Sequence, residues 1–188
     1  MSCKLRVVAI LIFLLLTIPA YAATFKGKVI DADTKQPIEG AVVVAAWHEA
    51  TATVAGESTR LKDVKETLTG KNGEWAIKGP KGRWSGNITA IFTFLTGTYY
   101  TRPPQFIIFK PAYCSWSIEA FGIDACREKL KPTGMDGFAK GETVEIPKLT
   151  NKEDRLRNLP GPINGREKQK EFIRLINEES RYLGLRKY

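Results

Sequence analysis

Histidine and cysteine are scarce in this sequence, and their scarcity limits the chemistry that it can support. The 188 residues include one histidine, His48, and three cysteines. A single imidazole excludes a zinc site built on two histidines. A Ser-His-Asp triad would have to use His48, and no nucleophile sits in a recognisable elbow. Asp31 and Asp33 lack the further acidic residues of a calcium loop. We therefore expect no enzyme, no metal and no cofactor.

Long apolar segments are absent beyond the N-terminus. The apolar run of residues 7–18 follows Lys4 and Arg6, and a membrane-spanning helix would need roughly 20 such residues. Pro19 and the small-residue triplet at 20–22 come next, which is typical of a signal peptide. We expect residues 1–22 to be cleaved after Ala22, which predicts a periplasmic or extracellular protein with no integral membrane segment. A retained anchor is the alternative.

Two cysteines would remain after cleavage, because Cys3 lies in the predicted signal peptide. An even cysteine count in an oxidising compartment favours a disulfide between Cys114 and Cys126. A bridge over so short a loop would contribute on the order of 3 kcal/mol. Two reduced thiols with unrelated roles are the alternative.

Basic residues outnumber acidic ones. The predicted signal peptide takes two of the 29 basic residues and none of the 20 acidic ones, which leaves 27 against 20, a net charge of +7. Such a surface favours acidic partners: an acidic protein face, an acidic polysaccharide or anionic lipid headgroups. We expect no nucleic acid partner. A lysine-rich surface that only keeps the domain soluble and protects sheet edges is the alternative.

Period-2 alternation and turn residues dominate up to about residue 148. They predict seven strands, at 25–31, 41–49, 64–69, 74–78, 87–95, 105–110 and 143–147. Both faces of 41–49 are apolar, which is typical of a central strand. The segment 50–61 is predicted as a surface loop, and Lys71-Asn72-Gly73 is predicted to turn 64–69 back into 74–78 as an antiparallel hairpin. This pattern favours a mainly β, seven-stranded antiparallel sandwich.

Several of these positions resemble a known family. Gly27-Lys28-Val29-Ile30-Asp31, Thr34, Pro37-Ile38, Gly40-Ala41 and Val43 are similar to the opening of the carboxypeptidase regulatory-like domain, a transthyretin-like (Ig-like) β-sandwich. Glu66-Thr67 with 70–75 resembles its next hairpin, and 110–113 resembles its strand end, with Ala112 where a glycine is commoner. The resemblance spans roughly 24–110. It implies a sandwich domain over 23–148 and an accessory, non-catalytic role, since the family mostly serves as a module attached to other proteins.

Two segments combine aromatic and basic side chains, which suit sugar stacking or the anchoring of a protein partner. The candidate ligand-binding residues are Lys81, Arg83 and Trp84 in one segment, and Tyr99, Tyr100 and Arg102 in the other. Core packing is the alternative for most aromatics, and Trp75 in particular is expected to be buried. The insertion 111–141, which carries both remaining cysteines, is either a functional loop or a disulfide-stapled cover over the sheet edge.

The region 149–188 is predicted to be a helical extension. A short helix at 151–158 has Thr150 as a plausible N-cap, and a second helix at 166–183 closes at Gly184. Phe172, Leu175, Ile176 and Leu183 form its apolar stripe. The stripe needs one surface to cover it, which is either the chain's own sandwich or a partner.

Together these features predict an exported, non-catalytic binding or adaptor module. An envelope or extracellular protein is the favoured partner, and a carbohydrate or cell-wall ligand is the first alternative. A hydrolase is the second alternative, because distant carboxylates could still assemble into a pair, or His48 could lie beside a nucleophile.

Overall fold

The structure is a computed structural model, and it describes residues 22–53, 56–81, 99–117, 126, 130 and 135–188. Three predictions lie outside the described residues: the signal peptide up to Tyr21, the strand at 87–95, and the placement of Arg83 and Trp84. The described chain is mainly β, with two sheets and a helical C-terminal region, as the sequence predicts.

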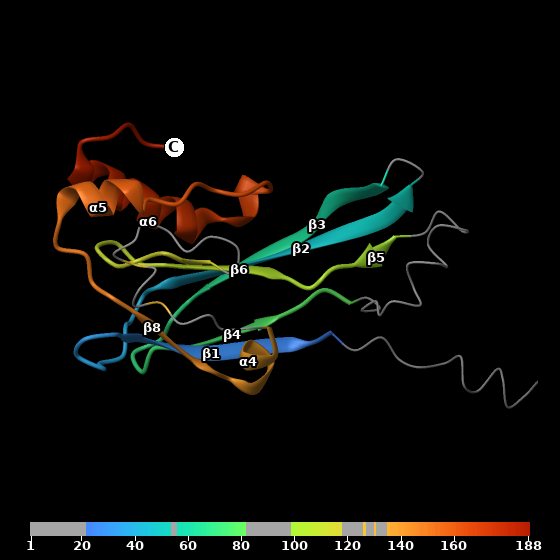
Figure 1. The fold of residues 1–188 in the computed structure, drawn as a ribbon, viewed down its shortest axis with the longest axis horizontal. Coiled ribbons are helices and arrows are strands. Elements are labelled where there is room, and N and C mark those ends of the chain that lie inside the picture. The colour runs from blue at the N-terminus through green and yellow to red at the C-terminus, as the bar shows by residue number, and fades with distance from the viewer. Residues whose placement is uncertain (1–21, 54–55, 82–98, 118–125, 127–129, 131–134) are drawn as a thin grey trace, which may run out of the picture.

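The elements form three layers (Figure 1). One outer layer is a three-stranded sheet in the order β4 (Glu74–Lys78), β1 (Thr24–Asp31), β8 (Thr143–Ile146). The middle layer is a sheet in the order β3 (Gly56–Leu68), β2 (Val42–Thr53), β6 (Gln105–Phe109), β7 (Trp116–Ser117), with β5 (Tyr100–Thr101) also paired to β2. The helices α5 (Lys152–Arg157) and α6 (Lys170–Leu183) form the third layer, and α4 (Met135–Lys140) lies beside β1.

Strand β2 is the centre of the molecule because both of its faces are apolar. Val43, Ala45 and Trp47 point into the core between the two sheets, and Val42, Val44 and Ala46 belong to a second core under α6. All six side chains are fully buried. The prediction of a central strand at 41–49 is confirmed.

The apolar stripe of α6 docks on the chain's own sheet, which decides between the two surfaces considered above. Phe172, Leu175 and Ile176 pack with Val64 and Phe109, and the rings of Phe109 and Phe172 meet edge to face at 6.1 Å. Burying each such side chain contributes roughly 1.5–3 kcal/mol. Hydrophobic packing therefore makes the extension part of the fold.

The predicted hairpin between 64–69 and 74–78 is wrong, although both strands exist. Strand β4 pairs antiparallel with β1, placing Gly27 opposite Trp75. The turn at Gly73 carries the chain from one sheet to the other: Gly73 O accepts a hydrogen bond from Val29 N, and a Cβ on Gly73 would lie 2.3 Å from Val29 O. Trp75 and Ile77 join the inter-sheet core from the side opposite β3.

The all-antiparallel expectation also needs correction, because β8 pairs parallel with β1, with Lys28 opposite Thr143. Two short strands, β5 and β7, lie where none was predicted. The predicted loop 50–61 is wrong as well. Strands β2 and β3 continue past a register shift between Trp47 and His48 as an antiparallel arm, since threonines such as Thr51 and Thr53 suit a strand as well as a loop.

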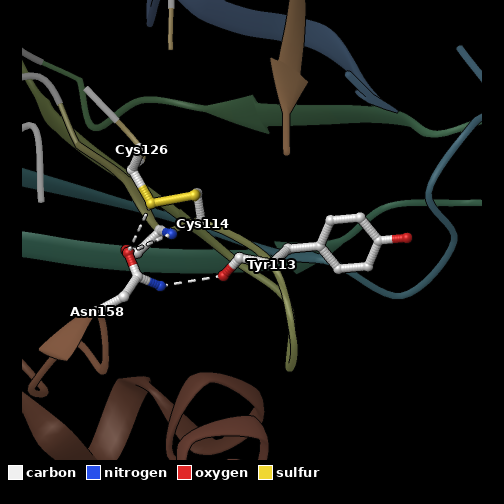
Figure 2. Close-up of a disulfide and its surroundings, with 5 residues drawn as sticks. Tyr113, Cys114, Cys126 and Asn158 are labelled. Atoms are coloured by element: carbon white, nitrogen blue, oxygen red, sulfur yellow. Dashed lines mark hydrogen bonds between the residues drawn. A yellow bond between two sulfur atoms is a disulfide. The ribbon is translucent and has the colours of Figure 1, made fainter. Parts of the chain in front are cut away.

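The predicted disulfide is confirmed: Cys114 and Cys126 are bonded, with their Cα atoms 5.8 Å apart. Figure 2 shows Asn158 beside the bridge, with the Tyr113 ring turned away from it. The Asn158 side chain donates to Tyr113 O at 3.0 Å and accepts from Ser115 N at 3.0 Å. The described part of the insertion therefore covers the core and is tied to the helical extension. Its helix α4 was not predicted.

The helix ends differ in detail from the prediction. The N-cap of α5 is Asn151 and not Thr150, because the Asn151 side chain accepts a hydrogen bond from Glu153 N at 2.9 Å. The expected helix 166–183 is divided into a 3-10 turn at Arg166–Lys168 and α6 proper. The Gln169 side chain, fully buried between them, donates to the carbonyls of Ile163 and Asn164. Gly184 closes α6 in the left-handed conformation, as predicted.

Candidate binding site

The arm formed by β2, β3 and β5 positions three of the candidate ligand residues. Tyr100 and Arg102 both contact one carboxylate, that of Glu57 on β3: the Tyr100 hydroxyl donates to it at 2.5 Å, and the Arg102 guanidinium forms an ion pair with it. The Tyr100 hydrogen bond, foremost, and Arg102 hold the pKa of Glu57 below its ordinary value against a small opposing effect of burial. The contacts of Tyr100 and Arg102 with Glu57 therefore link β5 and the residue after it to β3.

A second carboxylate on the arm, Glu49, forms ion pairs with Arg60 at 2.8 Å and with Lys62 at 3.1 Å. Burial raises the pKa of Glu49, but these two cations outweigh it and the pKa lies below its ordinary value. The Arg60 guanidinium also lies 4.0 Å from the centre of the Tyr99 ring. Tyr99 is 42% exposed, yet one face of its ring is covered by an arginine.

The other aromatic and basic candidates divide between core and surface. Trp47, Trp75 and Trp116 are buried, so they offer no stacking surface, and the prediction for Trp75 is confirmed. Lys81 is exposed at the end of the described segment after β4. The structure brings Tyr99, Tyr100 and Arg102 together on the arm, and their role in ligand binding stays a prediction.

A hollow that the sequence did not reveal lies on the three-stranded sheet, beside the C-terminal end of α4. Its volume is about 620 Å³. Side chains of β1, β4, α4 and β8 line it: Lys26, Lys28, Glu74, Ala76, Lys140 and Thr143, with Gly27, Trp75 and Gly141 completing the wall. Period-2 geometry explains the arrangement, because Lys26 and Lys28 share one face of β1 while Phe25 and Val29 point into the core.

Gly141, in the turn after α4, allows Lys140 to lie close to Lys26 of β1. Gly141 has a φ of 88°, a conformation that favours glycine. A Cβ there would lie 3.4 Å from Cε of Lys26, so the Lys26 stem crosses directly over the turn that follows Lys140. Cations from two distant parts of the chain therefore meet at one rim.

The three lysines of the hollow are free to bind. Among the described residues, Lys26, Lys28 and Lys140 have neither an ion-pair nor a hydrogen-bond partner for their ammonium groups. Glu74 stands opposite Lys28 in the strand register, but no ion pair joins the two. This differs from the arm, where Glu49 and Glu57 are matched by cations. Chemically, three ammonium groups against one carboxylate can hold an anionic group.

The hollow could have been suspected only in part from the sequence. The spacing of Lys26 and Lys28 within an alternating strand indicates two lysines on one outer face. Nothing in the sequence places Lys140 beside them, because that contact depends on the parallel pairing of β1 with β8 and on α4, a six-residue helix that contains a glycine, Gly137.

Three further observations concern metal binding, His48 and membrane insertion. No group of three or more potential metal ligands occurs within the ranges that the structure describes. His48 is half-buried on β2, and its main-chain carbonyl accepts a hydrogen bond from Arg102 N at 2.7 Å. In the part of the chain that is described, no helix has the length and apolar character needed to cross a membrane.

Comparison with known proteins adds little evidence on what this site binds. The chain matches no protein family model, and no curated protein matches it in sequence. A solved structure of a streptococcal ancillary pilin is similar in part, with a TM-score of 0.30 and 11% sequence identity over 71% of this chain and 31% of the pilin. A similarity this low carries no argument, so membership of the carboxypeptidase regulatory-like family stays a prediction from the sequence.

Proposed function

We propose that this chain is an exported, non-catalytic binding module that holds an anionic group of another envelope or extracellular component in the lysine hollow. The observation that carries the proposal is the convergence of three unpaired lysines, Lys26, Lys28 and Lys140, on one open hollow. The Cys114–Cys126 disulfide supports the export part of the proposal, since such bonds persist in oxidising compartments.

A protein carboxylate is the favoured ligand. Lysine ammonium groups are compact point charges, and they suit a cluster of acidic side chains on a partner surface. Sugar recognition uses exposed aromatic rings, and Trp75, the one aromatic among the described residues that line the hollow, is only 5% exposed. An acidic polysaccharide is the competing ligand, recognised by its charge alone.

The test compares two triple variants of equal net charge. Lys26→Gln/Lys28→Gln/Lys140→Gln removes the cations of the hollow, and Lys148→Gln/Lys152→Gln/Lys170→Gln removes three exposed lysines from elsewhere. Each protein is titrated calorimetrically with a hexaglutamate peptide and with an oligogalacturonate, at low and at moderate salt.

We expect the first variant to bind hexaglutamate at least about tenfold more weakly than wild type, and the control to differ by less than about twofold. Equal losses in both variants would mean that only net charge matters, which contradicts the proposal. Selective binding of oligogalacturonate at the hollow would replace the protein ligand by the polysaccharide.

A further inference from the structure

Exposed aromatic and leucine side chains gather on the helical extension. The large hydrophobic residues that are exposed in the described chain number six, and four of these are Leu156, Tyr182, Leu185 and Tyr188. Tyr182 is 57% exposed and Tyr188 is 56% exposed. Tyr182 lies in the last turn of α6, and Leu185 directly follows the Gly184 cap. We name these four side chains, together with Arg181, Arg186 and Lys187, the C-terminal patch.

The backbone of the patch is held in place. Leu185 N donates to Ser180 O at 2.8 Å, and Tyr188 N donates to the Asn177 side chain at 2.8 Å. The last residues therefore fold back along α6, and Figure 1 shows the C-terminus lying over α5 and α6. The Tyr188 hydroxyl lies 3.8 Å from the position that a Cβ on Gly161 would take. A partner would meet an ordered surface and would pay little entropy to order it.

Cations frame the aromatic rings. The Arg155 guanidinium lies 3.8 Å from the centre of the Tyr182 ring, while its nitrogens bond the Glu179 carboxylate at 2.6 Å. Arg181, Arg186 and Lys187 are exposed and have no ion-pair partner among the described residues. By contrast, Glu153 and Glu178 at the edge are paired with Arg157 and Arg174. The free charge of the patch is therefore positive.

From this arrangement we propose that the C-terminal patch is an interaction surface for an acidic peptide segment of a partner protein, one that carries leucine or phenylalanine between its carboxylates. Tyrosine and arginine are the residues that supply most binding energy in protein interfaces, and Arg181, Arg186 and Lys187 complement acidic side chains. Binding to an anionic membrane is the outcome that the vesicle measurement below separates from peptide binding.

The patch is separate from the lysine hollow. The hollow lies on the three-stranded sheet, and α5 and α6 lie beyond the other sheet, so the two surfaces are on opposite sides of the molecule (Figure 1). The inference therefore goes beyond the proposed function and does not depend on it. One chain with both surfaces would bridge two partners.

The test uses a matched pair of double variants. Leu185→Ser/Arg186→Gln changes the patch, and Leu68→Ser/Lys71→Gln makes the same kinds of change at an exposed leucine and lysine at the end of β3 and the turn that follows it. The probe is a short fluorescent peptide of glutamates with interspersed leucine and phenylalanine, titrated by anisotropy against the full chain. Circular dichroism verifies that each variant is folded, and Tyr182→Ser provides a second, independent change within the patch.

All of these variants are made in the background of the lysine-hollow triple variant, so that the hollow does not bind the glutamates of the probe. In that background we expect the patch variants to weaken peptide binding at least about tenfold, while Leu68→Ser/Lys71→Gln binds within about twofold of the background protein. Peptide binding that survives the patch changes would overturn the proposal. It would also be overturned if the patch variants instead lost binding to phosphatidylglycerol vesicles, or lost self-association in sedimentation, with peptide binding unchanged.

Discussion

The carboxylate of Glu66 on β3 accepts a hydrogen bond of 2.9 Å from the main-chain N–H of Phe172, in the first turn of α6. Its other oxygen accepts one of 2.8 Å from Glu171 N. A helix has no internal partners for its first N–H groups, so a strand residue acts as the cap that Gln169 does not supply. The contact joins the middle sheet to the helical extension at the point where α6 begins.

Glu66→Ala should therefore lower the free energy of unfolding by about 1–2 kcal/mol, because two N–H groups and the helix dipole lose their acceptor. Urea unfolding followed by circular dichroism measures the loss. Glu167→Ala, at an exposed position of the preceding turn, is the matched control and should change stability by less than about 0.5 kcal/mol. Equal effects of the two variants would refute a capping role for Glu66.

The pair formed by Arg155 and Glu179 predicts non-additive mutations. The Glu179 side chain is 3% exposed, and it also accepts a hydrogen bond from Ala112 N at 3.2 Å. Glu179→Leu leaves the Arg155 cation without its partner and should cost about 3–5 kcal/mol. The double variant Arg155→Met/Glu179→Leu should recover more than half of that loss. A double-mutant cycle by chemical denaturation checks this, and additive losses would mean that the pair is not coupled.

The disulfide predicts a redox-dependent stability. Cys114 and Cys126 are separated by 12 residues, so removing the bridge should cost about 3 kcal/mol by releasing the unfolded chain. Cys114→Ala/Cys126→Ala should unfold at the same denaturant concentration with and without dithiothreitol, whereas wild type should fall to a similar stability only in the reductant. A wild type that is insensitive to reduction would show that the bridge contributes nothing.

The hydrogen bonds of Asp31, at the end of β1, predict how the stability of the protein changes in acid. Burial alone would raise the pKa of Asp31, but hydrogen bonds from the N–H groups of Thr34 and Asp33 and from Tyr113 outweigh it, so the pKa lies below its ordinary value. A carboxyl with a lowered pKa in the folded state stabilises the protein above the unfolded pKa, and this contribution is lost as the pH falls through the folded pKa.

Asp31→Asn keeps an acceptor for the same N–H groups but does not titrate. Its stability should therefore fall less steeply than that of wild type below about pH 4, as measured by thermal unfolding across an acid series. Asp33→Asn, at an exposed neighbouring position, provides the comparison. Parallel curves for wild type and Asp31→Asn would contradict the assignment.

Ala112 predicts a stabilising mutation. Its φ of 67° lies in the left-handed region, which costs a residue with a Cβ roughly 1–2 kcal/mol. Ala112→Gly relieves this strain at a smaller cost in unfolded-chain entropy, so the free energy of unfolding should rise by about 0.5–1 kcal/mol. Ala76→Gly, in the extended strand β4, should instead destabilise the protein. A decrease in stability for both variants would show that Ala112 is not strained.

Local patterns predicted those parts of the fold that depend on neighbours in sequence. The two apolar faces of 41–49 indicated a central strand, the spacing of Phe172, Leu175 and Ile176 indicated one buried helix face, and the cysteine count favoured the disulfide. Each of these follows from a periodicity or a count that any packing arrangement must respect.

The pairing of strands could not be predicted in the same way. Lys71-Asn72-Gly73 does form a turn, but a turn does not determine which strand the next segment pairs with. Strand β4 pairs with β1, and Trp75 therefore enters the core from the three-stranded sheet and not from the sheet that contains β3. The arm has few apolar residues, so its strands depend on cross-strand contacts such as Glu49 with Arg60. The hollow needs Lys26 and Lys140 together, a contact that only the folded chain creates.

The parallel pairing of Lys28 with Thr143 also sets when the protein can fold. A polypeptide delivered N-terminus first, from the ribosome or through a translocation pore, presents β1 long before β8 arrives. The pairs of β1 with β4 and of β2 with β3 lie within the earlier part of the chain, but the β1–β8 pair needs the late segment. The three-stranded sheet can therefore be completed only when β8 has been delivered.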